Sequence, residues 1–103
     1  MSKADEYNYL VVYKEYPDYT RKVEEVRSAS CVVAYVYKVK DQIVTLSTTY
    51  GTQETYYFKR FNGDVGGFWM SICGCRFSDV IYLNGEYPSL ILNLITTRCR
   101  PYE

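Results

Sequence analysis

The stretch YNYLVVYKEY, from Tyr7 to Tyr16, decides the kind of fold that this chain of 103 residues can adopt. Aromatic and β-branched residues dominate the stretch, and both types favour extended backbone. Its odd-numbered members from Tyr7 to Tyr13 fall on one face of an extended segment. Pro17 follows and favours an extended conformation for the residue before it. The pattern predicts a β-strand over residues 7–16.

A helix is predicted directly after this strand. Asp18 is a suitable N-cap, and Tyr19, Val23 and Val26 recur at helical spacing with charged residues between them. We therefore expect about three helical turns over residues 19–29.

Three strands are predicted in the middle of the chain. Residues 30–40, 43–50 and 55–61 are rich in β-branched and aromatic residues, and turn signals at residues 41–42 and at Gly51 separate them. Such an order is typical of an antiparallel meander. Because both faces of residues 30–40 are partly apolar, we expect that segment to be a central strand.

The last third of the sequence carries mixed signals. Residues 62–67 have the composition of a loop. Residues 68–77 fit a strand or a short helix, and we favour a strand. The Asn-Gly pair inside residues 80–87 predicts a hairpin, whereas residues 89–99 fit helical and strand spacing equally.

Taken together, these segments predict one α+β domain over residues 1–103. We expect a mainly antiparallel sheet of about five strands, with one or two helices packed on one face. Thirteen tyrosines against three alanines favour a sheet over a helical bundle, because the phenol ring suits a pleated, half-exposed surface.

The composition excludes several classes of function. Twelve basic residues balance twelve acidic ones, so no overall field attracts nucleic acid or a membrane. Histidine, the commonest general base and metal ligand, is absent. We therefore expect no enzyme, no catalytic residues and no cofactor. No segment has the apolar length of a membrane span and the polar N-terminus lacks an apolar leader, so we expect a cytoplasmic protein without a membrane partner.

The four cysteines do not have the spacing of a metal site. They are Cys31, Cys73, Cys75 and Cys99, and only one close pair exists, a CxC. We expect no bound metal. We expect some of the four to be small buried hydrophobes, and one or two long-range disulfides to link Cys73 or Cys75 to Cys31 or Cys99.

Two strands place aromatic rings beside cations, as a platform for single-stranded nucleic acid requires. The candidate residues are Tyr35, Tyr37, Lys38 and Lys40 on the first strand, and Tyr56, Tyr57, Lys59 and Arg60 on the second. Alternation, however, turns the rings of residues 35 and 37 away from the lysines at 38 and 40.

In whole-chain character the sequence resembles the small orphan proteins of crenarchaeal viruses, filamentous and rod-shaped ones included. The resemblance is one of composition and is carried by the tyrosine clusters YNYLVVYKEY and TYYFKRF, the scarcity of alanine, and cysteines in an apparently cytosolic chain. It transfers no functional residue. It implies an intracellular viral protein of a thermophilic host, tolerant of disulfides and engaged in binding.

Two functional hypotheses follow. The first is a non-enzymatic interaction protein, a homodimer or bound to a protein partner, that uses a tyrosine-rich surface. The alternative is a nucleic-acid-binding protein that uses the basic and aromatic residues of the sheet.

Overall fold

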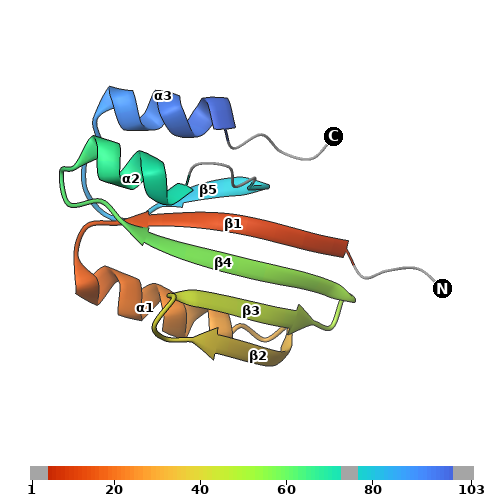
Figure 1. Cartoon of the computed structure of the whole chain (residues 1–103). Helices are drawn as coiled ribbons and strands as arrows, with labels where there is room; N and C mark the ends of the chain where they lie inside the picture. Colours follow the sequence, from red (N-terminus) through yellow and green to blue (C-terminus); the bar gives the residue numbers. More distant parts are fainter. Residues whose placement is uncertain (1–4, 73–76, 99–103) are drawn as a thin grey trace.

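The predicted first strand lies inside a five-stranded sheet with three helices. The computed structural model describes residues 5–72 and 77–98. In chain order its elements are β1 (Asp5–Tyr13), α1 (Tyr16–Arg27), β2 (Val32–Lys38), β3 (Ile43–Thr48), β4 (Thr52–Arg60), α2 (Val65–Ile72), β5 (Asp79–Tyr82) and α3 (Ser89–Arg98). The strand order is β2-β3-β4-β1-β5 (Figure 1). The predicted α+β class and number of strands are confirmed.

The sheet is mixed, so the prediction of a mainly antiparallel sheet is wrong. β2, β3 and β4 form the predicted antiparallel meander. β1, however, pairs in parallel with β4 on one side and with β5 on the other. Parallel neighbours need long crossover connections, here through α1 with the β2–β3 hairpin and through α2. Local sequence patterns do not report such distant pairings.

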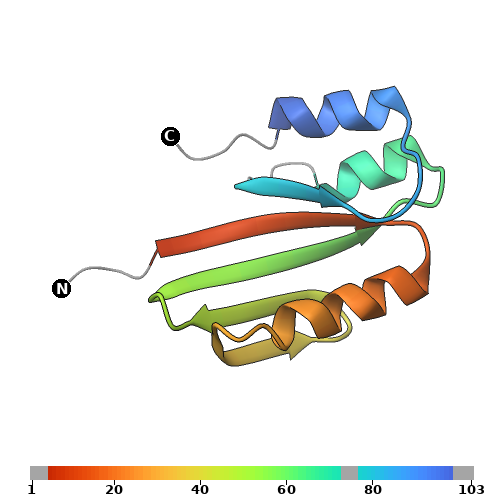
Figure 2. The same ribbon diagram turned by 180° about the vertical axis from the view of Figure 1, so that it is seen from behind.

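The three helices of the described residues cover both faces of the sheet, whereas we expected one or two helices on one face. Leu10 and Val12 of β1 pack under α2 and α3, and Val11 and Tyr13 pack under α1 on the opposite face. The two views of Figures 1 and 2 show α1 apart from the α2–α3 pair. All four β1 side chains are almost completely buried, which is typical of a strand with parallel neighbours and covered faces.

The first strand ends earlier, and the first helix begins earlier, than predicted. The residue with extended backbone before α1 is Glu15, and Pro17 lies inside the first helical turn. Proline is tolerated there because the first helical N–H groups need no partner within the helix. Asp18 is therefore not the N-cap; it pairs with Arg21 in the first turn.

β2 is an edge strand and not the central strand that we expected. It pairs with β3 alone. Most residues of the strand are exposed, so the apolar residues on its two faces do not indicate burial on both sides.

α2 takes the place of the predicted strand from residue 68 and of the last part of the predicted loop, whereas residues 62–64 form a loop as expected. Asp64 accepts a hydrogen bond from the backbone N–H of Gly67 at 3.0 Å, which caps the helix, and α2 begins at Val65. Phe68 and Ile72 lie one turn apart and are both buried. Residues 73–76 lie outside the described residues.

The predicted hairpin at residues 80–87 is also wrong. β5 pairs in parallel with β1, and Gly85 at φ 117° turns the chain toward α3 instead of into a returning strand. The Tyr87 hydroxyl donates toward the carbonyl oxygens of Val12 and Leu83, at 3.2 and 2.8 Å. These bonds hold the connection against the end of β1.

The segment at residues 89–98, whose type we left open, is the helix α3. Ile91 and Ile95 lie one turn apart and are buried against β1. Among the residues that the structure describes, no helix has the length and apolar character needed to cross a bilayer.

Replacing Leu10 with alanine should lower the free energy of unfolding by about 2–5 kcal/mol, because the side chain is fully buried between β1 and the α2–α3 pair. Chemical denaturation measures the change. Val33→Ala is the matched control: Val33 is 67% exposed, so its loss should change stability by less than about 0.5 kcal/mol. Equal losses in the two variants would contradict this view of the core.

Candidate functional site

One cluster of tyrosines packs in the core and at its margin. Tyr19 of α1 stacks on Tyr13 of β1 at 5.1 Å between ring centroids, and its edge meets Phe58 of β4 at the same distance. The hydroxyls of Tyr19 and Tyr37 lie 2.5 Å apart and share a hydrogen bond, and Tyr13 donates to Gln42 at 2.8 Å. These rings therefore fill space and satisfy their own polar atoms.

A second pair of rings lies farther along the same face. Tyr9 and Tyr56 stack at 4.9 Å, and the Tyr56 hydroxyl donates to the Glu54 carboxylate at 3.0 Å. Burial, followed by the negative charge of Glu54, raises the pKa of both hydroxyls above the usual value. Both phenols stay protonated near neutral pH, so neither can serve there as a general base.

The exposed surface of interest lies along β2. Four successive residues of this strand, from Val33 to Val36, are exposed, and none of them is charged. Tyr35 is 48% exposed, and the Arg27 guanidinium lies over its ring at 5.6 Å from the centroid. Val39, which follows the strand, is exposed as well. We call Val33, Tyr35, Val36 and Val39 the β2 surface.

The free edge of β2 also presents backbone groups. Thr49 donates its N–H to the Cys31 carbonyl, so the odd-numbered residues of β3 direct their backbone toward β2. Their partners in β2, such as Val36 opposite Thr45, bond inward. The alternate residues Tyr35 and Tyr37 consequently direct N–H and C=O toward the free edge.

The eight residues predicted for a nucleic-acid-binding face do not share one side of the sheet. The register places three of the rings on the side that carries α1, namely Tyr35, Tyr37 and Tyr56. On the opposite side lie one ring and two cations, namely Tyr57, Lys38 and Lys59. Arg60 neighbours Tyr13 on the α1 side, and Lys40 lies in the turn after β2. Rings and cations are thus largely separated.

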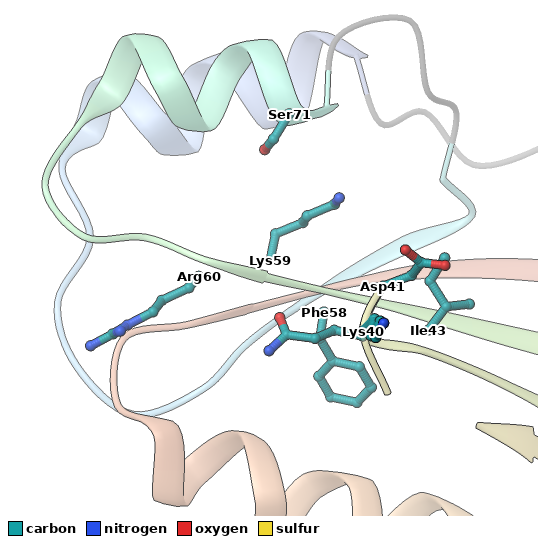
Figure 3. A pocket seen from close by; sticks show the side chains of 8 residues that line it. Lys40, Asp41, Ile43, Phe58, Lys59, Arg60 and Ser71 are labelled. Carbon is teal, nitrogen blue, oxygen red and sulfur yellow. The ribbon is translucent and has the colours of Figure 1, made fainter. Parts of the chain in front are cut away.

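Cations do gather around an open hollow of about 520 Å³ between the β2–β3 turn, the end of β4 and the end of α2. Lys40, Lys59 and Arg60 line it together with the carboxylate of Asp41. Figure 3 shows Lys59 extending toward Ser71, whereas Arg60 points away from that residue. Among the side chains that the structure describes, all ion pairs lie within α1, so these three cations have no carboxylate partner there.

The predicted disulfides are not seen. Cys31 is the one cysteine within the described ranges, and its thiol is free. Cys73, Cys75 and Cys99 lie outside the described residues, so any pairing among these three stays a prediction. In the same ranges no three acidic or cysteine side chains come together as metal ligands.

Sequence reasoning did not identify Arg27 as a residue of the candidate surface, and it did not predict that Val33 and Val36 are exposed. Arg27 ends α1 only a few residues before β2, and its place over Tyr35 depends on how the helix returns to the sheet. No local signal separates an edge strand with exposed valines from a buried central one.

Raising the pH above 10 should destabilise the fold through its buried phenols. Burial raises the pKa of Tyr56 in the folded state, so its contribution to stability is complete below pH 10, the value for an unfolded tyrosine, and is lost as the pH rises further. Chemical denaturation between pH 9 and about 11 should show that the free energy of unfolding declines less steeply with pH for Tyr56→Phe than for the parent chain. Tyr50→Phe, at a site 79% exposed, is the control; the same decline in all three proteins would contradict the prediction.

Comparison of the chain with protein-family models, with curated proteins and with solved structures gave no match. Its function must therefore be inferred from the geometry of its own residues.

Proposed function

We propose that this chain is a non-enzymatic protein that acts by binding a protein partner through the β2 surface. The observation that carries the proposal is the run of exposed, uncharged residues from Val33 to Val36 on an unpaired sheet edge. A partner segment in extended conformation would continue the sheet by adding a strand beside β2.

Exposed edges of this kind are usually protected. Natural sheets block them with lysines, prolines, strong bulges or very short strands, because open edges pair with other chains. β2 has seven residues, no proline, and a single charge, Lys38, at its end. It has one irregularity, between Val32 and Ala34. The edge is therefore long and apolar enough to pair, as a binding surface must be.

The side chains around the edge suit a protein interface. Tyrosine and arginine are enriched where binding energy concentrates, and Tyr35 with Arg27 above its ring supplies both. Val36 adds apolar area on the opposite side of the strand. The compositional resemblance to small proteins of crenarchaeal viruses supports such a role, with a viral or host macromolecule as the partner.

A library of displayed random peptides should yield binders with alternating apolar residues, and Val36→Lys should abolish their binding. The added charge lies beside the edge and must be desolvated when a strand pairs there. Met70→Lys is the matched control, because Met70 is also an exposed apolar residue but lies on α2, away from β2. A library that yields no binders, or binders lost equally in both variants, would refute the proposal.

Nucleic-acid binding is a second candidate, favoured by one observation. The cations of the hollow, together with Lys38 on the uncovered side of β2, have no carboxylate partners among the described residues. They would be available to phosphate groups. The separation of the rings from Lys38 and Lys59 weighs against base stacking, so this candidate predicts binding through the backbone of the nucleic acid.

Under this second candidate, affinity for a single-stranded oligonucleotide should fall steeply with salt. Lys59→Gln should reduce the slope of log affinity against log salt by about 0.7, the value for one lost phosphate contact. Fluorescence anisotropy measures both effects. Lys22→Gln is the control, because Lys22 is already paired with Glu25 on α1. Absence of binding at low salt would exclude the candidate.

A further inference from the structure

We infer that the partner that fits β2 is a second copy of this chain, paired antiparallel to the first about Tyr35. The inference rests on the proposed function, since it names the occupant of the same surface. Two five-stranded sheets would then join, edge to edge, into one continuous sheet with a twofold axis at Tyr35.

The backbone of β2 suits this arrangement. Tyr35 directs both its N–H and its C=O toward the free edge, as derived above from the Thr49–Cys31 hydrogen bond. Across a twofold axis, Tyr35 of each copy would exchange both hydrogen bonds with Tyr35 of the other. Tyr37, whose backbone also faces the edge, would come opposite Val33 of the second copy, where β2 has its irregularity. The outward backbone groups of Tyr35 are thus satisfied by the same residue of the second copy.

The charges of β2 favour the antiparallel direction. Its one charged residue is Lys38, at the carboxyl end. Antiparallel pairing about Tyr35 places the two Lys38 side chains at opposite ends of the new ladder, each opposite Val32, whereas in-register parallel pairing would set them side by side. The whole chain has a formal net charge of zero, so two copies do not repel each other at long range.

The side chains are complementary on both sides of the joined sheet. On the side that carries α1, the two Tyr35 rings become direct cross-strand neighbours, with Arg27 of each copy over its own ring. On the open side, Val36 of one copy lies opposite Ala34 of the other. Both residues are exposed in the single chain, and both lose water contact when the strands pair.

Sedimentation over a series of protein concentrations tests the inference. We expect a reversible dimer, and Tyr35→Pro should raise its dissociation constant about tenfold or more, because it removes an outward N–H without removing a bond to β3. Tyr35→Ala keeps that N–H and should weaken the dimer less. Should Tyr35→Pro fail to fold, as judged by circular dichroism, Val36→Lys replaces it with the same expected loss. A chain that stays monomeric at millimolar concentration overturns the inference.

A cross-link tests the register. Tyr35→Cys places two thiols directly across the twofold axis, where Cα atoms of a hydrogen-bonded pair lie about 5.5 Å apart, within disulfide range. Mild oxidation followed by peptide mass spectrometry should find residue 35 joined to residue 35, and Tyr50→Cys, in the β3–β4 turn, should not link to itself. A dimer that lacks this link has another interface. If the chain is a monomer but still selects extended peptides from the library, the inference of a dimer is overturned and the proposed function stands.

Discussion

The double burial of β1 is the constraint on which the structure depends. Four successive residues, Leu10 to Tyr13, point alternately to the two faces of the sheet and are almost fully buried on both. Such a strand is stable only if helices cover both faces and strands flank both edges. The parallel neighbours β4 and β5, α1 on one side, and α2 with α3 on the other meet these conditions.

Covering β1 leaves β2 open. β2, at the far edge of the sheet, keeps one neighbouring strand and much exposed surface, although α1 reaches it through the hydroxyl of Tyr19 and the side chain of Arg27. Tyrosine suits both settings: Tyr13 and Tyr19 are buried with bonded hydroxyls, whereas Tyr35 remains half exposed beneath Arg27. Because this small chain builds its core around β1, the edge of β2 stays free to pair with another strand. The binding role that we propose follows from that imbalance.

Prediction from the sequence succeeded for short-range order and failed where distant segments meet. The meander from β2 to β4 was predicted because its strands are neighbours along the chain and alternate clearly. The predicted hairpin at Asn84-Gly85 was wrong because β1 offers β5, the strand before this turn, a longer and more buried partner. For the candidate site, the alternation of side chains correctly predicted that Tyr35 and Tyr37 face away from Lys38. No local sequence pattern, however, showed that β2 is an edge strand.

The sequence by itself determined the α+β class, the approximate number of strands and the extended nature of the first strand, since all these follow from composition and periodicity. Only the tertiary structure decided the parallel pairing of β1, the helices on both faces, the helical form of residues 65–72 and 89–98, and the exposure of Val33 and Val36. The physical reason is that local propensity acts over a few residues, whereas burial depends on which distant segments pack together.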